Sequence, residues 1–434
     1  MSSLIGRNID SLIRFFIYVL IFWLPYSPAV VETCVIICCI LWAYKRRILF
    51  IGYFQKAGPL TVKQEFSLFL ETFRPSPTIL DRPIAFFLAA CLISVIFSRD
   101  LLSSSHAFFT KTLEWFIVYY LVIEVFKTRR HIFVALCVFL TTGFATCLDA
   151  FIQYYITHKD LFNGRLLARG GATAAFKHAN SLAAFLTIFL PAVFAFFFVK
   201  GKSKNQKFLT AMAFCLGVWI LILTFSRSAI FASILGAGLA VYFLKRKIFI
   251  WVLMILFLGL TAYVFSPSAG FEWKTDRGDV QNSFEWRLAV WFDSFKMIRE
   301  RPLTGHGLNT FMDIFRQYRR RADAFYEYEP TYAHNCYIQL LAETGILGFI
   351  GFFWILIKFF KEITGSIKNY LIRPPDELFL WQIGFMSGIF AFLVHSFFDS
   401  NFYSLLLSVL FWVMAGLCVS SFNILNSTVF CDKK

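Results

Sequence analysis

Charged residues are scarce in this chain. Only 16% of its 434 residues are Asp, Glu, Lys or Arg, whereas 58% are hydrophobic and the mean hydropathy is +0.66. Soluble domains carry about 25% charged residues, so this composition excludes an ordinary soluble protein. The ten-residue alternation typical of outer-membrane barrels is also absent. The sequence therefore predicts an all-α polytopic membrane protein.

The sequence also lacks the features typical of disulfide-rich, metal-binding and nucleic-acid-binding proteins. Nine of the ten cysteines lie in or beside apolar segments, which favours packing residues over a disulfide scaffold. No Asp-x-Asp-like motif or cluster of metal ligands is evident, so we expect neither a metal nor another cofactor. The net charge of +16 would suggest nucleic acid in a soluble protein. Here most of that excess lies in short loops, so topology explains it better and no nucleic-acid partner is expected.

Twelve apolar segments are long enough to be candidate spans, and the first lacks a convincing cleavage site. They lie near residues 12–27, 29–44, 83–98, 108–126, 132–156, 180–199, 208–225, 228–244, 248–266, 335–357, 379–398 and 402–424. Lys and Arg concentrate in alternate loops if both termini are cytoplasmic, which predicts that orientation. The organisation expected is nine spans in 1–266, a periplasmic loop over 267–333, and three spans with a tail in 334–434.

The long outer loop has its own helical periodicity. Apolar residues recur at helical spacing from Phe284 to Ile298 and again from Phe311 to Tyr318, with a Pro/Gly turn at 302–307 between them. We expect two amphipathic helices that form a lid over the outer membrane face. The alternative is that they only rest on the lipid surface.

A histidine stands where this loop returns to the membrane. His334 and Asn335 are followed by nine residues and then by Gly345 and Gly348. Imidazole exchanges protons near neutral pH, so His334 is a candidate catalytic base, with a polar interface role as the alternative. Glycines spaced by three allow close helix packing, which would hold the histidine rigidly. Asp399, four residues after His395, is a candidate partner that orients His334.

Arginines on the outer side need an explanation, because positive charge is disfavoured there. Arg227 follows Ser226 in a very short connection, and Ser226 is a candidate N-cap that would place Arg227 at a helix N-terminus, a favourable anion site. Arg287 lies in the first loop helix. Arg169 could extend the same anion site, close to Asn180, a predicted N-cap for the sixth span. Snorkelling or solvated arginines are the alternative.

Together these elements resemble the O-antigen ligase and O-antigen polymerase superfamily of bacterial envelopes. The His-Asn, nine-residue, Gly-x-x-Gly pattern at His334 matches that family's motif, and Ser226-Arg227 is similar to its serine–arginine element. Two further elements of the family are similar to parts of this chain: the stretch from Trp286-Arg287 to the 302–307 turn, and residues 178–183. The likeness covers about residues 165–400 in motifs and the whole chain in topology, and the first five spans match no motif.

The resemblance implies a metal-independent glycosyltransferase of the bacterial inner membrane with its site on the periplasmic face. Its donor would be an undecaprenyl-diphosphate-linked glycan, and Arg227, Arg287 and Arg169 would bind the diphosphate. His334 would be the base, with Ser226, Asn335, Asn180, Gly345, Gly348 and Asp399 in support. The acceptor would be lipid A core in the favoured ligase branch, or a lipid-linked repeat unit in the polymerase branch. A transporter or lipid flippase is the alternative of another class, although no similarity between two halves is seen.

Overall fold

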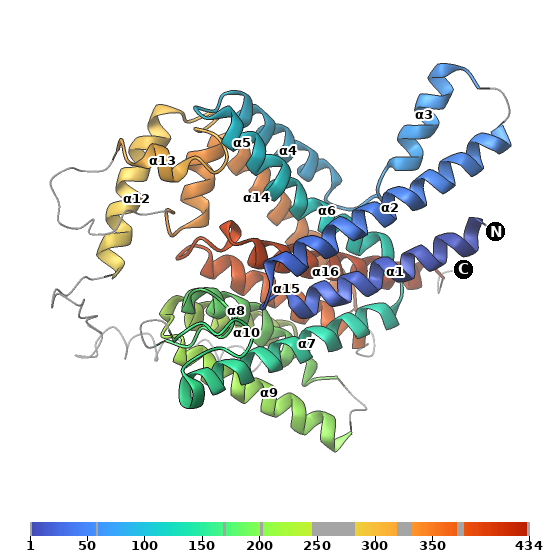
Figure 1. Cartoon of the computed structure of the whole chain (residues 1–434). Helices are drawn as coiled ribbons and strands as arrows, with labels where there is room; N and C mark the ends of the chain where they lie inside the picture. Colours follow the sequence, from blue (N-terminus) through green and yellow to red (C-terminus); the bar gives the residue numbers. More distant parts are fainter. Residues whose placement is uncertain are drawn as a thin grey trace.

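The chain folds into a bundle of helices, seen in the computed structural model in Figure 1. The structure describes residues 2–57, 60–167, 171–199, 203–244, 283–318, 332–370 and 377–431. Within these ranges there is no β-strand, only one isolated bridge between Lys159 and Leu166. The predicted all-α class is confirmed.

The described residues form the following helices. In chain order they are α1 (Ser2–Trp23), α2 (Pro28–Ala57), α3 (Val62–Phe73), α4 (Asp81–Ile96), α5 (Leu101–Ala107), η1 (Phe108–Thr112), α6 (Leu113–Val125), α7 (Arg129–Ile152), η2 (Gln153–Thr157), α8 (Ala179–Phe196), α9 (Lys204–Leu223), α10 (Arg227–Leu244), α12 (Ser283–Glu300), α13 (Phe311–Phe315), α14 (Cys336–Tyr370), α15 (Glu377–His395), η4 (Asn401–Tyr403) and α16 (Leu405–Cys431).

Seven described helices are long and apolar enough to cross a membrane: α7 extended by η2, α8, α9, α10, α14, α15 and α16. They coincide with seven of the twelve predicted spans. Helices also occupy the four expected positions between residues 12 and 126, but they do not meet the same criteria of length and composition. The predicted span at 248–266 lies outside the described residues. A polytopic membrane protein is confirmed, and the number of twelve stays a prediction.

The centre of the bundle is built by α8, α15 and α16. The most apolar stretches of α15 and α16 are each 89% buried, whereas that of α9 is only 28% buried and belongs to the periphery. Small residues allow the central helices to approach closely. A Cβ atom added to Gly388 of α15 would lie 2.7 Å from the Ile188 carbonyl oxygen of α8, so this crossing depends on glycine.

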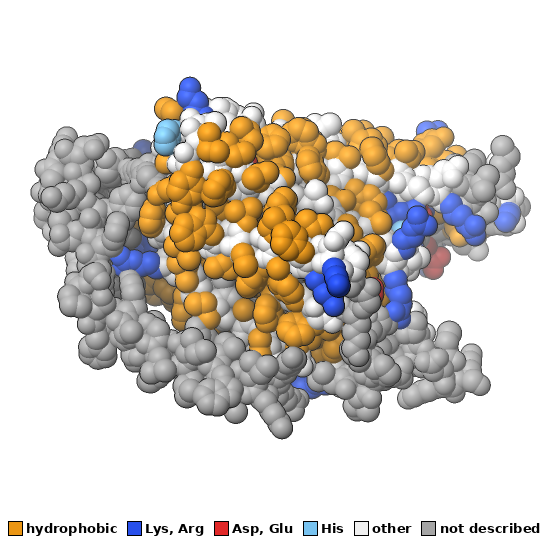
Figure 2. Space-filling model, turned by 90° about the horizontal axis from the view of Figure 1, so that it is seen from below, with side chains coloured by type: hydrophobic (Ala, Val, Ile, Leu, Met, Phe, Trp, Pro, Cys, Tyr) orange, Lys and Arg blue, Asp and Glu red, His pale blue; other side chains and the backbone are white. Residues whose placement is uncertain are grey.

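The surface agrees with a membrane location. Figure 2 shows hydrophobic side chains over the middle of one face, with Lys and Arg mostly toward its ends. Exposed Phe, Ile, Leu and Trp side chains occur on most of the spanning helices, as lipid contact requires. In Figure 1 the start of α1 and the end of α16 lie at the same end of the bundle, and α12 and α13 lie at the other.

The predicted loop helices are both present, but the second is short. Helix α12 begins at Ser283, as the periodicity predicts, whereas α13 has only five residues and ends before Tyr318. Both helices share a small separate core with the start of α14, built by Val290, Met297, Phe311, Ile314, Phe315, Ala333 and Ala342. They therefore pack on the start of α14, and the lid stays a prediction.

Candidate active site where helix ends meet

Five helix ends meet at the end of the bundle that carries α12 and α13. Helices α8 and α15 run antiparallel, because Gly388 meets Ile188 and Gly384 meets Ala192, so the N-terminus of α8 lies beside the C-terminus of α15. The amide of Ala172 donates to the Leu223 carbonyl oxygen at 2.9 Å, which brings the α9–α10 connection to the same end. The amide of Cys336 donates to the Ser396 carbonyl at 2.9 Å and adds the start of α14.

His334 lies in the tight entry into α14. Its backbone is left-handed, with φ of 49°, a conformation that is uncommon for residues other than glycine. The residue that follows His334 in the His-Asn motif has a structural role. Asn335 Oδ1 accepts hydrogen bonds from the amides of Tyr337 at 3.0 Å and Ile338 at 3.1 Å. Asn335 is therefore the side-chain N-cap of α14. The amide of Ala333 donates to Gln339 Oε1 at 3.0 Å, so both neighbours of His334 are held.

The imidazole of His334 contacts Asp399. Its Nδ1 lies 3.3 Å from Asp399 Oδ1, and the two side chains are 29% and 16% exposed. The predicted contact between these residues is present. Burial opposes ionisation of Asp399, but the hydrogen bond and charge of His334, together with His395 and Arg287, hold the pKa of that carboxyl well below its usual range. Asp399 is therefore a carboxylate at neutral pH and can accept Nδ1–H.

Helix α12 closes the other side of the imidazole. The Trp286 ring lies edge-on to the His334 ring, with centroids 5.2 Å apart. One turn later, Trp291 Nε1 donates to the Ala333 carbonyl at 3.0 Å, and its ring contacts Phe397 after α15. Arg287 lies close enough to lower the pKa of Asp399. The structure thus brings His334, Asp399 and Arg287 together, and it adds Trp286, which the residue pattern alone did not single out as a site residue.

Gly345 interrupts α14 instead of packing it against another helix. Its φ of 63° and ψ of −169° are not helical, so the prediction of a close-packing position is wrong there. An added Cβ atom would lie 2.3 Å from the Leu303 carbonyl oxygen, because the 302–307 turn fills the break. Gly348 has a different role from Gly345, because the lack of a side chain there leaves room for the Thr344 side chain of the preceding helical turn. Gly351 does pack closely, against Phe86 and Phe87 of α4.

The broken helix and the Pro/Gly turn are joined by backbone hydrogen bonds in both directions. The amide of Ile346 donates to the Pro302 carbonyl at 2.8 Å, while the amide of Gly307 donates to the Glu343 carbonyl at 2.9 Å. A further bond of 3.1 Å runs from the amide of His306 to the carbonyl of Ala342. These bonds satisfy backbone groups that the break exposes, so the two glycine motifs form one structural unit.

A buried glutamate anchors this unit and was missed from the sequence. Glu343 Oε2 accepts from the amide of Asn309 and from the Tyr403 hydroxyl, both at 3.0 Å, and its Oε1 accepts from Gln339 Nε2 at 3.2 Å. Gln339 in turn holds Ala333 beside His334. A glutamate within an apolar span is the signal that could have found it, because charge in a span is costly unless it is used.

Ser226 and Arg227 begin α10, but Ser226 does not cap it through its side chain. The Ser226 carbonyl accepts from the amide of Ile230 at 3.1 Å, whereas its buried Oγ has no partner among the described residues. The reason is the preceding turn, where Phe225 has a φ of 53° and the amide of Ser226 is bound by Thr224 Oγ1. Arg227 is the first residue of α10, as expected, at the same end of the bundle as His334.

The sixth predicted span starts one residue earlier than expected. Helix α8 begins at Ala179 with His178 as its N-cap residue, so Asn180 is its second residue and the predicted N-cap is wrong. The His178 carbonyl already accepts from Ser181 and Leu182, which positions the cap there. Arg169 lies outside the described residues. Nearby Arg165 donates to the Ala175 carbonyl at 2.7 Å and thereby holds its own loop.

Metal ligands do not gather in the described ranges, where no group of three or more His, Cys, Asp or Glu side chains is placed to hold an ion. The chemistry that this arrangement offers is a partly buried histidine–carboxylate pair beside an indole, with arginine close by. Such a pair can take a proton, and the arginine can bind an anion.

Comparison with known proteins agrees with the motifs. Residues 211–353 match the family model described as O-Antigen ligase. This segment holds Ser226, Arg227, Arg287, His334 and both motif glycines, and the match confirms the superfamily resemblance. A Haemophilus influenzae protein (strain ATCC 51907 / DSM 11121 / KW20 / Rd), described as an uncharacterized protein, is 23% identical over 239 residues. The alignment covers 51% of this chain and 59% of that relative's length.

Proposed function

We propose that this membrane protein, which matches the O-antigen ligase family over residues 211–353, is a glycosyltransferase that moves a glycan from undecaprenyl diphosphate to lipid A core oligosaccharide. The single observation that carries this proposal is the His334–Asp399 pair, 3.3 Å apart, beside Trp286 and near Arg287. This is a base with its orienting carboxylate, next to a cation that suits a diphosphate. The site belongs on the periplasmic face of the bacterial inner membrane if the positive-inside bias sets the orientation.

His334 acts as the general base in this mechanism. Asp399 accepts Nδ1–H, which leaves the Nε2 lone pair for the proton of the acceptor sugar hydroxyl. The hydroxyl oxygen forms a bond to the anomeric carbon of the donor as the bond from that carbon to the diphosphate oxygen breaks. The undecaprenyl diphosphate leaves with the electron pair, and direct attack inverts the anomeric configuration. A positioned general base contributes about 10²–10⁴-fold to such a rate.

Arginine stabilises the leaving group. Negative charge grows on the diphosphate as the bond breaks, and the planar fork of a guanidinium binds phosphate oxygens bidentately. We assign this role to Arg287, which acts on Asp399 electrostatically, and to Arg227 at the start of α10. The N-terminus of α10 adds its own partial positive charge. Arg169 is proposed as a third member of this set from its place in the sequence.

The test is glycan transfer by the purified full-length protein from an undecaprenyl-diphosphate glycan. Two acceptors are compared in parallel, lipid A core and a second lipid-linked repeat unit. We expect transfer to lipid A core that falls by at least about 100-fold in His334→Ala. The matched control is His106→Ala, because His106 is an exposed histidine on α5. Transfer only to the lipid-linked unit would support the polymerase branch, and wild-type transfer by His334→Ala would contradict the catalytic role.

A further inference from the structure

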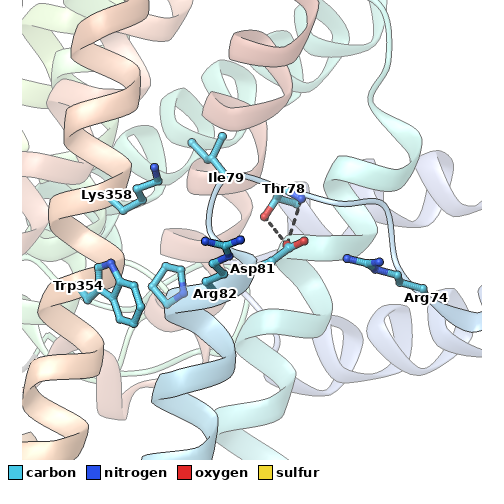
Figure 3. Close-up of a pocket in the computed structure, with 8 residues that line it drawn as sticks. Arg74, Thr78, Ile79, Asp81, Arg82, Trp354 and Lys358 are labelled. Atoms are coloured by element: carbon cyan, nitrogen blue, oxygen red, sulfur yellow. Dashed lines mark hydrogen bonds between the residues drawn. The ribbon is translucent and has the colours of Figure 1, made fainter. Parts of the chain in front are cut away.

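A pocket lies at the opposite end of the bundle from His334. It measures about 410 Å³ and is lined in part by Arg74, Arg82, Asp81, Trp354 and Lys358. These residues come from the segment before α4, the start of α4 and the middle of α14 (Figure 3). None of them takes part in the proposed transfer reaction.

The depth of the pocket follows from helix geometry. Helices α4 and α14 run antiparallel, since Ser94 Oγ donates to the Glu343 carbonyl at 2.7 Å and Phe87 packs on Gly351. Arg82 precedes Ser94 on α4, and Lys358 follows Glu343 on α14. At 1.5 Å per residue, both lie about 20 Å from the level of Glu343, and Glu343 lies about 10 Å beyond the start of α14 at Cys336. The hydrocarbon core of a bilayer is about 30 Å thick, so the pocket lies near the other membrane boundary.

Positive charge dominates the pocket. Arg74, Arg82 and Lys358 all line the pocket (Figure 3), against a single lining carboxylate. That carboxylate is already engaged, because Asp81 Oδ1 accepts from Thr78 Oγ1 at 2.7 Å and from the Tyr120 hydroxyl at 2.9 Å. Lys358 is shared with Glu362, 2.7 Å away on the next turn. Two arginines with a lysine can bind a phosphate by forked and single hydrogen bonds.

Apolar surface continues from the pocket along the seam between α4 and α14. Trp354 is 42% exposed and stands edge-on to Phe86, with ring centroids 5.7 Å apart. Ile350 and Ile357 on the same stretch of α14 are 50% and 64% exposed. Phosphate alone would use only the cations of this site. A molecule with an anionic head and apolar chains would use both the cations and the seam.

Helix α3, next to the pocket in the sequence, also indicates a position at the membrane interface. It ends at Phe73, directly before Arg74, and it exposes Val62, Phe66 and Leu70. An amphipathic helix with exposed apolar residues belongs in the plane of a membrane interface. Arg74 is therefore held at headgroup level, where basic residues attract anionic lipids.

We propose that Arg74, Arg82 and Lys358 bind the phosphate of an anionic phospholipid whose chains lie along the Phe86–Trp354 seam. The site is independent of the transfer reaction. It ties the α2–α3 hairpin, α4 and α14 to the lipid surface at the end of the bundle away from His334. Phosphatidylglycerol has the required chemistry, because its head carries one phosphate and no cation.

The experiment measures lipid binding to the purified full-length protein in detergent by native mass spectrometry. Phosphatidylglycerol, phosphatidylcholine and inorganic phosphate are compared as ligands. We expect the affinity for phosphatidylglycerol to fall by about 25-fold in the double variant Arg82→Gln/Lys358→Gln, since each basic residue contributes about fivefold. Lys361→Gln is the matched control, because this exposed lysine lies on the same helix three residues from Lys358.

Several outcomes would overturn the proposal. One is a double variant that binds phosphatidylglycerol as well as Lys361→Gln does. Another is inorganic phosphate that displaces the lipid at equal concentration, which would make this a site for soluble phosphate. Equal affinity for phosphatidylcholine would also refute the requirement for an anionic head. If the double variant fails to fold, Arg74→Gln, on an exposed side chain, must still weaken binding by about fivefold.

Discussion

Asp399→Asn tests the proposed mechanism most directly. The substitution keeps the size of the side chain and an Oδ1 that can accept from the Ser400 amide, which lies 2.7 Å away. It removes the charge that faces His334 Nδ1 at 3.3 Å. A hydrogen bond to a charged group contributes about 1.5–3 kcal/mol, and its full value is realised only when the imidazole becomes cationic in the transition state.

That energy converts to a loss of about 10–200-fold in kcat, since about 1.4 kcal/mol corresponds to a factor of ten. The His334 side chain is 29% exposed and the Asp399 side chain 16%, so water screens part of the interaction. We therefore expect a loss toward the lower part of this range, about 10–50-fold. The KM for the lipid-linked donor should change less than about threefold, because the interaction grows only as the proton moves.

The assay is initial-rate glycan transfer at several donor concentrations, which separates kcat from KM. Asp313→Asn is the matched control, because it removes an exposed carboxylate from α13 at the same end of the bundle. The melting temperature of Asp399→Asn should stay close to that of the wild type. An unchanged kcat, or a loss confined to KM, would refute the orienting role of Asp399.

Three further predictions follow from the same structure. Gly345→Ala should destabilise the protein by about 1–3 kcal/mol in thermal unfolding, because alanine disfavours its backbone angles, whereas Gly365→Ala, with open space on the same helix, should not destabilise it. Burial, and then the charges of two nearby arginines, lower the pKa of His306 from 6.5, so the neutral form is favoured when folded. Opening of residues 301–310 should therefore become easier as pH falls below 6.5, and hydrogen-exchange protection factors that stay constant below pH 6.5, after correction for the pH dependence of intrinsic amide exchange, would contradict this. Arg287→Lys should lose at least about tenfold in transfer rate despite its retained charge, and full activity would exclude bidentate diphosphate binding.

The interlock of the 302–307 turn with α14 links stability to function. Glu343 binds the segment that follows the turn through the Asn309 amide, and it binds Gln339, which holds Ala333 next to His334. The entry to α14 that carries His334 and the 302–307 turn therefore share one buried network. Networks of this kind position a side chain only while every member is satisfied, which explains why a glutamate is kept inside an apolar helix.

The sequence by itself determined the class of fold and the main candidates for the site. A low charged fraction and long apolar runs require helices that satisfy their own backbone in lipid, so the all-α membrane class followed directly. His334, Asn335 and Arg287 were identified because their residue types and spacing are unusual at a membrane border. These signals are local, and local signals can be read from a linear chain.

Only the tertiary structure decided what the glycines and the long-range partners do. Gly345 looked like a packing position, yet it breaks α14 because a turn more than 30 residues earlier inserts its carbonyls there. Asp399 and Trp286 lie far from His334 in sequence, and helix packing brings one to its Nδ1 and the other to its ring face. Hydrogen bonds between distant segments depend on how whole helices pack. The hydrophobic periodicity of the sequence predicts the helices but not how they pack against one another.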